Sequence, residues 1–437
     1  MQHTRMAVSV PRPEAADTGS AIERAITQLA ASPALLEAIA YFRAHEGQFA
    51  RWQTELAKIP APPFGEAARG QWLAKCFKDL GLDNIHIDET GNVCGLRSGP
   101  KKNKAKPVLA ISAHIDTVFP EATPIVVRQE GTRILGPGIS DNAAGVTAML
   151  AIAGSLRQAK IAHDTGILFI GNVGEEGEGD LRGMRHIFTS SRYKDSIGYS
   201  LILDGAGTDT IVSEALGSRR FEITVRGPGG HSWSDFGLPN PILALARSIY
   251  LFTQTQLPAS PKTTFNVGVI RGGTSVNSIP ESASMRVDIR SSSSTEMQRL
   301  ETALRVAVAE AVKAENHISA NRSDGHRQSA STDLRSLSSF IKPIGSRPAG
   351  ELPPEARMLR TIRAVDKHLH NKAQVQRAST DANIPLSLGR EALSIGGGGS
   401  GGGAHTLQEW FDPQGREVGL TRILLTALAL TGVTSKS

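Results

Sequence analysis

The fold of this chain is set around residues 108–116, which read VLAISAHID. The largely apolar run from Val108 to Ala113 is short and continuous, which predicts a strand that is buried on both faces. His114 and Asp116 follow this run where the strand ends. Because imidazole and carboxylate groups are common metal ligands, the stretch predicts a metal site at the end of a buried strand.

Strands and helices alternate along the chain on either side of this run. Further strands are predicted over Gly166–Asn172, Ser200–Asp204 and Leu393–Ile395. Helices are predicted over Ala21–Lys58, Glu66–Leu80, Ala143–Gln158 and Pro354–Leu369. Alternation of this kind favours an α/β domain in which a mostly parallel sheet is flanked by helices.

The pattern changes after Asp204, where polar and apolar residues begin to alternate as in half-exposed antiparallel strands. From there the predicted order is strand, helix, strand, strand, helix, strand, which is the order of a ferredoxin-like α+β unit. Its elements are predicted over Arg219–Val225, Pro241–Thr253, Thr263–Arg271, Ser282–Arg290 and Glu296–Ala314, with a last strand near His317–Arg322. The polar stretch 323–346 then returns the chain to the first domain. We therefore predict a discontinuous first domain over 1–217 and 328–437, and an inserted domain over 218–327.

Composition supports two globular domains in a chain of 437 residues, since hydrophobic residues make up 40% and charged residues 21%. The net charge is +6, but only the lysines of residues 101–106 form a cluster. We interpret them as a solvated loop between strands, with nucleic-acid binding a remote alternative. Two cysteines and no long apolar run predict a cytoplasmic protein that needs neither disulfides nor a membrane.

Further candidate metal ligands follow other predicted strands, at the edge where open α/β sheets bind ligands. Each has a plain structural explanation: Asp141 as a helix N-cap, Glu175 and Glu176 as an acidic loop, Asp204 as a turn residue, and His405 as a side chain packed beside its neighbours. Their joint occurrence at successive strand ends favours two metal ions that share one carboxylate, and hence metal-assisted hydrolysis.

Roles within this set are partly open. Asp116 can accept a hydrogen bond from the ring nitrogen of His114 that does not bind metal. The side chains of Glu175 and Glu176 diverge, so one can bind metal while the other acts as general base. The glycine-rich segment 396–403 precedes His405, and we interpret it as a close approach of the backbone to a ligand or metal rather than a flexible linker.

With these residues in place, the chain resembles the M20 family of metallopeptidases and amidohydrolases. The resemblance extends from Ile59 to the C-terminus. It rests on five ordered motifs, which are SAHIDTV at 112–118, GISDN at 138–142, GEEG at 174–177, GGH at 229–231 and GAHT at 403–406.

The resemblance implies a site for two Zn²⁺ ions, with Co²⁺ or Mn²⁺ as alternatives. The implied ligands are His114 and Asp204 on one ion, Glu176 and His405 on the other, and Asp141 bridging both. Glu175 then acts as general base, and Asp116 orients His114.

The inserted domain likewise resembles the lid and dimerisation domain of the family, which implies a homodimer. His231 then reaches the active site of the partner subunit, where it helps to stabilise the oxyanion. Asn277 and Arg290 match positions that contact the carbonyl or carboxylate of the substrate.

Aspartate at position 204 is typical of the di- and tripeptidases of the family, so we expect hydrolysis of an amide bond in a short peptide. An N-acyl-amino-acid amidohydrolase is the alternative. Residues 398–402 also match the G-x-S-x-G motif of serine hydrolases, but no acid lies between Ser400 and His405, the only histidine that follows it. A non-catalytic binding protein is a further alternative, and loss of ligands would mark it.

Overall fold

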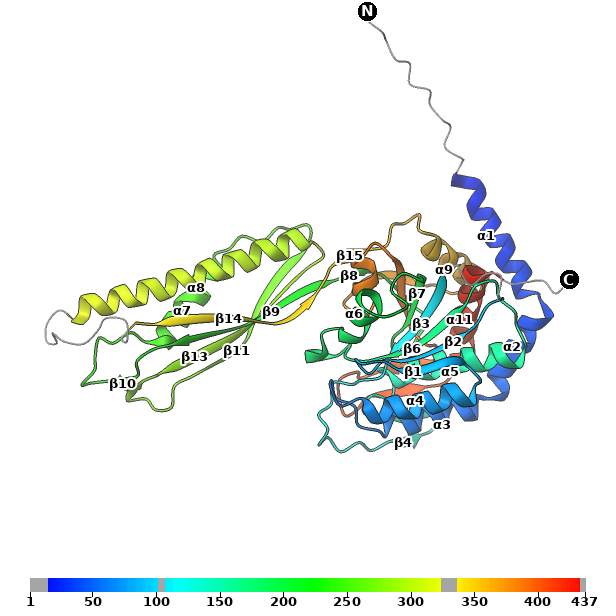
Figure 1. Ribbon diagram of the computed structural model, residues 1–437, viewed down its shortest axis with the longest axis horizontal. Coiled ribbons are helices and arrows are strands. Elements are labelled where there is room, and N and C mark those ends of the chain that lie inside the picture. The colour runs from blue at the N-terminus through cyan, green and yellow to red at the C-terminus, as the bar shows by residue number, and fades with distance from the viewer. Residues whose placement is uncertain (1–14, 101–106, 324–335, 433–437) are drawn as a thin grey trace, which may run out of the picture.

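A computed structural model describes residues 15–100, 107–323 and 336–432 of the chain. The chain folds into a larger lobe that contains both ends of the described chain and an elongated lobe formed by the insertion (Figure 1). The predicted lysine loop at 101–106 lies outside the described residues.

A mixed sheet of nine strands forms the centre of the larger lobe, in the order β1-β2-β6-β3-β7-β17-β8-β15, with β16 also paired to β8. Four central neighbours, β6, β3, β7 and β17, run parallel. The strands span Asp83–Ile87 (β1), Val93–Arg97 (β2), Val108–His114 (β3), Ile167–Asn172 (β6), Ile197–Leu203 (β7), Thr210–Ala215 (β8), Gly350–Glu351 (β15), Gln374–Ala378 (β16) and Glu391–Ile395 (β17). The predicted α/β class with a mostly parallel sheet is confirmed.

Helices of the larger lobe span Ala15–Ala30 (α1), Pro33–Ala44 (α2), Glu46–Ala57 (α3), Ala67–Asp79 (α4), Ala143–Gln158 (α5), Arg182–Thr189 (α6), Arg357–His368 (α9), Asn383–Ser387 (α10) and Arg416–Thr431 (α11). The single helix predicted over 21–58 is three helices. Ser32 caps α2, and Pro33 occupies its first turn, so a new helix begins there. Among the described helices none is by itself long and apolar enough to cross a membrane, although the bent pair Ala21–Ala30 and Pro33–Ala44 together meets the criteria of length and composition.

The inserted domain is a four-stranded antiparallel sheet in the order β11-β13-β9-β14, with two helices on one face. Its elements span Gly217–Arg226 (β9), Pro241–Thr253 (α7), Thr263–Gly272 (β11), Ser282–Ser291 (β13), Ser294–Ser323 (α8) and Ser338–Arg347 (β14). A short pair, Gly230–His231 (β10) and Ser278–Ile279 (β12), lies at the end of the domain far from the larger lobe (Figure 1). The predicted order strand, helix, strand, strand, helix, strand is therefore present.

Two predictions for the insertion are wrong. The segment His317–Arg322 is the end of helix α8, because Ala311, Glu315 and Ser319 continue the four-residue spacing of buried positions. The last strand is β14, which pairs with β9 over most of its length. The second boundary therefore lies after residue 347 rather than after 327.

The glycine-rich segment 396–403 packs closely against other parts of the protein itself. A methyl group on Gly396 would lie 2.3 Å from the carbonyl oxygen of Ala206, and one on Gly401 would lie 2.3 Å from the hydroxyl of Ser140. Ser400–Gly402 forms a short strand, β18, that pairs with Trp410–Asp412 (β19). The other edge of β19 pairs with Arg133–Leu135 (β5), which in turn pairs with Arg128–Glu130 (β4). This small sheet therefore joins residues 400–412 to the segment before α5.

Candidate metal centre

The parallel strands bring the predicted ligands to one edge of the sheet. His114 is the last residue of β3 and is paired with Asn172, the last residue of β6. Glu175 and Glu176 follow β6, and Asp204 follows β7. Since these strands are parallel neighbours, their carboxyl ends and the loops after them meet at the same place.

Asp141 lies at the centre of the cluster. Its Oδ1 is 3.1 Å from Nε2 of His114, and its Oδ2 is 3.2 Å from Nε2 of His405. Nε2 of His114 is also 3.7 Å from Oδ1 of Asp204, and Nε2 of His405 is 3.1 Å from Oε1 of Glu176. The five side chains thus form two groups, each with one imidazole and one further carboxylate, that share Asp141.

These spacings fit two bound metal ions. Two ligands that bind one tetrahedral zinc at roughly 2.0–2.2 Å lie about 3.4 Å from each other. The separations between the imidazole nitrogen and the carboxylate oxygens within each group run from 3.1 to 3.7 Å. Imidazole nitrogen with carboxylate oxygen also suits Zn²⁺, Co²⁺ or Mn²⁺.

The carboxylates shift the pKa values of both imidazoles. Burial favours neutral His114, but the nearby carboxylates of Asp116, Asp141 and Asp204 raise its pKa well above the ordinary value. The hydrogen bond to Asp141 raises the pKa of His405 to about 9, and the same two imidazoles lower the pKa of Asp141 against the effect of its burial. Protons therefore compete with a metal cation for the two Nε2 atoms, so metal affinity should fall as the pH falls.

Asp116 supports the ligands in a different way from the one predicted. Nδ1 of His114 is 3.1 Å from the backbone oxygen of Asp116 but 3.6 Å from its carboxylate. The carboxylate, which is fully buried, accepts the backbone N–H groups of Glu175 at 3.0 Å and Glu176 at 2.8 Å. Asp116 thus fixes both His114 and the turn that carries the two glutamates.

Glu175 is buried beside the ligands and forms an ion pair with the inserted domain. Its Oε1 accepts a hydrogen bond at 2.8 Å from Arg347, the last residue of β14, which also donates to the backbone oxygen of Glu175. Burial raises the pKa of Glu175 well above its ordinary value, whereas the charge of Arg347 opposes that rise. Sequence reasoning missed Arg347 because the segment around it was interpreted as a polar connection.

Two further buried carboxylates near the site were not predicted. Glu409, four residues after His405, accepts three backbone N–H groups from the loop that carries Asp141. Asp381, which is fully buried, accepts a hydrogen bond at 2.6 Å from Asn172, and burial raises its pKa to about 7. The only sequence signal was an acidic residue beside apolar ones, which does not say what it contacts.

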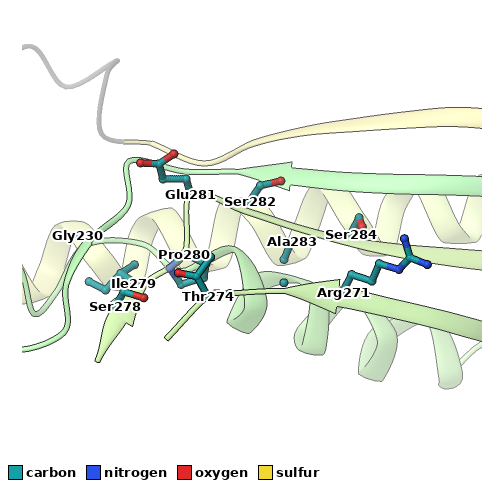
Figure 2. A pocket seen from close by; sticks show the side chains of 12 residues that line it. Gly230, Arg271, Thr274, Ser278, Ile279, Pro280, Glu281, Ser282, Ala283 and Ser284 are labelled. Carbon is teal, nitrogen blue, oxygen red and sulfur yellow. The ribbon is translucent and has the colours of Figure 1, made fainter. Parts of the chain in front are cut away.

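The structure does not bring His231 and Asn277 to the cluster within one chain. Both lie around β10 and β12, at the far end of the inserted domain (Figure 1). A cavity of about 620 Å³ opens beside them, lined by Gly230, Arg271 and residues 278–284 among others (Figure 2). Among the described residues no hydrogen bond or ion pair joins either side chain to the metal ligands.

The turn after His231 fixes the state of its ring. Nδ1 accepts the backbone N–H groups of Trp233 at 3.2 Å and Ser234 at 3.3 Å, so neutral His231 carries its proton on Nε2. Arg290 lies nearer the larger lobe, because it and Arg347 both pair with Ser218 of β9. The guanidinium of Arg290 is 2.7 Å from Asp288.

Comparisons with known proteins agree with this arrangement. A model of the peptidase dimerisation domain matches residues 214–316, which cover most of the insertion, and a model of peptidase family M28 matches residues 92–220, which include His114, Asp141 and Asp204. A probable carboxypeptidase of Ajellomyces dermatitidis is 32% identical over 249 residues, which are 52% of this chain and 55% of that protein. The uncharacterized protein YqjE of Bacillus subtilis is 30% identical over 251 residues, 54% of this chain and 64% of that protein.

Solved structures share the fold across most of the chain. Aminopeptidase PepT from Bacillus cereus has a TM-score of 0.68 at 18% identity, with 88% of this chain and 98% of that one covered. The dipeptidase Dug1p from Saccharomyces cerevisiae has a TM-score of 0.66 at 11% identity, with 91% and 98% covered. The YxeP protein of Bacillus subtilis, described as a dinuclear metal binding peptidase from the M20 family, has a TM-score of 0.61 at 15% identity, with 89% and 99% covered. Together with the ordered motifs, these matches confirm the resemblance of the chain to the M20 family of metal-dependent peptidases and amidohydrolases.

Proposed function

We propose that this protein is a two-metal hydrolase that cleaves an amide bond of a short peptide. The observation that carries the proposal is the position of Asp141, whose two carboxylate oxygens contact His114 on one side and His405 on the other. A carboxylate in this position can bridge two cations about 3.5–4 Å apart. His114 and Asp204 would bind one ion together with Asp141, and Glu176 and His405 would bind the other.

Two Zn²⁺ ions held there would polarise the amide carbonyl and make a water molecule easier to deprotonate. Glu175 is the group placed to take that proton and deliver it to the leaving nitrogen, because its carboxylate is buried beside the ligands and binds none of them in the structure. A general base must be ionised before the attack and protonated after it. Burial raises the pKa of Glu175 well above its ordinary value, and the charge of Arg347 opposes that rise and so favours the ionised form that a base needs.

Several findings support a peptide as the substrate. Structures with a similar fold include proteins described as an aminopeptidase, a tripeptidase and a dipeptidase, and curated relatives are described as probable carboxypeptidases. The chain spans 55% and 64% of the length of the two curated relatives compared above, so the activity stays a proposal. An N-acyl amino acid is the alternative substrate, since it presents the same amide bond.

We propose further that the protein is a homodimer joined through the inserted domain, with His231 acting on the substrate in the partner subunit. The match to a peptidase dimerisation domain supports this arrangement. Strand β11 is an edge of its sheet, and Tyr250 on the neighbouring helix α7 is exposed, as are Trp233 and Phe236 beside His231. With its proton on Nε2, His231 could donate a hydrogen bond to a developing oxyanion, and Asn277 and Arg290 could contact the substrate. A cytoplasmic location stays a prediction.

Replacement of Glu175 by Gln should abolish turnover without loss of metal. Loss of general-base catalysis lowers kcat by about 10²–10⁴-fold, whereas Gln preserves the shape of the side chain. Zinc content by elemental analysis and hydrolysis of a panel of dipeptides, tripeptides and N-acyl amino acids would test this. Glu178→Gln, an exposed neighbour on the same loop, is the matched control and should retain full activity. A Glu175→Gln enzyme with wild-type turnover would rule out this role.

The variant Arg347→Gln should shift the acidic limb of the pH profile of kcat/KM to higher pH. Arg347 favours the ionised form of Glu175, so its removal raises the pKa of the base, and a higher pH is then needed to ionise it. Arg286→Gln is the control, since Arg286 lies on the same sheet but pairs with Glu222. An acidic limb that stays in place or moves to lower pH would contradict the proposed link.

A mixture of Glu175→Gln and His231→Ala subunits should regain activity that neither variant has alone. In a symmetric dimer that exchanges subunits freely, about a quarter of all sites would combine an intact Glu175 with an intact His231 from the partner. A mixture of Glu175→Gln and Asp141→Asn subunits is the control and should stay inactive, because both changes lie in the larger lobe. If verified heterodimers of the first pair show no regain, His231 does not act across the dimer.

A further inference from the structure

Glu409 stands out among the buried groups that the proposed chemistry does not use. Its side chain is fully buried, and its carboxylate accepts the backbone N–H groups of Gly138 at 2.7 Å, Ser140 at 2.7 Å and Asp141 at 2.6 Å. The segment that supplies these three donors precedes helix α5, so they have no carbonyl partners in a regular helix or strand. One carboxylate thus satisfies most of the buried N–H groups of this turn.

Glu409 also ties this turn to the loop that carries His405. Its backbone N–H donates to the carbonyl of Thr406 at 3.2 Å, and its own carbonyl accepts the N–H of Gly136 at 2.9 Å. The next residue begins strand β19, which pairs with β5 just before the turn. Two segments that are far apart in the sequence are therefore joined at one residue.

A buried cation lies close to the same turn. Arg69 is 1% exposed and donates to the backbone oxygens of Ile59 at 2.8 Å and Ile115 at 3.0 Å. Its Nη2 lies 3.7 Å from the position that a methyl group on Gly138 would occupy. Burial lowers the pKa of Arg69 to about 10, and the charges of Asp116 and Glu409 oppose that fall.

Asp116 and Glu409 therefore support the ligands in the same way, because each accepts backbone N–H groups of a loop that carries ligands. Asp116 accepts the N–H groups of Glu175 and Glu176, and Glu409 accepts those of the Asp141 turn. Hydrogen bonds from N–H groups to a carboxylate are roughly twice as strong as those to a neutral oxygen, so they can hold a loop in one conformation.

We propose that Glu409 is a positioning residue that holds the backbone of the Asp141 turn and the His405 loop in the arrangement that binds two metal ions. This inference rests on the proposed two-metal function. Glu409 touches neither substrate nor metal in this account. It fixes the backbone from which the side chains of Asp141 and His405 extend.

The test is zinc affinity, measured by titration of metal-free, full-length protein against a chromogenic chelator. In Glu409→Gln an amide –NH₂ replaces one of the two acceptor oxygens and faces at least one backbone N–H, and in Glu409→Asp the carboxylate is one methylene too short. Both variants should bind zinc about 10- to 100-fold more weakly than wild type, which is the usual effect of altering a group that orients metal ligands. The aspartate variant separates geometry from charge, because it keeps the negative charge that attracts a cation.

Asp366→Asn is the matched control. Asp366 is a buried carboxylate that pairs with Arg422 at 2.6 and 2.8 Å, between α9 and α11 and away from the ligands. Its loss should lower the thermal unfolding temperature of the metal-free protein without changing zinc affinity. The same unfolding measurement shows whether each Glu409 variant is folded. If the glutamine variant is not folded, the zinc affinity of the aspartate variant tests the proposal.

The outcomes are distinct. Wild-type zinc affinity in both Glu409 variants overturns the proposal. Weakened zinc binding in Glu409→Gln alone, with wild-type affinity in Glu409→Asp, also overturns it, since loss of charge then explains the effect. An equal loss of zinc affinity in Asp366→Asn overturns it as well. If the wild-type protein itself binds no zinc, cobalt or manganese, the proposed two-metal function fails, which is a different result.

Discussion

The structure depends on one electrostatic constraint, the concentration of carboxylates at the carboxyl ends of parallel strands. Asp141, Glu176 and Asp204 converge there on only two imidazoles. Carboxylates in a largely buried cluster must be balanced by cations or by protons. The raised pKa values of His114 and His405 show that this cluster attracts positive charge strongly. Divalent metal ions would satisfy the same demand, which is the basis of the proposed hydrolysis.

The surrounding fold provides the geometry that this cluster requires. Strands β3, β6 and β7 place their ends side by side, and the buried carboxylates of Asp116 and Glu409 hold the loops that follow. The inserted domain contributes Arg347 directly to Glu175. A change in the position of that domain would therefore act directly on the proposed base, Glu175, through its contact with Arg347.

The sequence predicted those features that depend on local patterns. The apolar run that forms β3 and the helix α5 both lie where their periodicity placed them, and the predicted metal ligands come together in space. Strand β14 was missed because its exposed, polar residues resemble a connection, and its identity as a strand depends on pairing with β9. Arg347 and Glu409 were missed for a related reason. Each acts through a contact with a residue far away in the sequence, and no spacing along the chain encodes such a contact.

The most direct test of the two-metal site is anomalous X-ray scattering from crystals grown with zinc. Two peaks are expected about 3.5–4 Å apart, one on each side of the Asp141 carboxylate, with His114 beside one peak and His405 beside the other. A single peak, or peaks that do not share Asp141, would contradict the two-metal site.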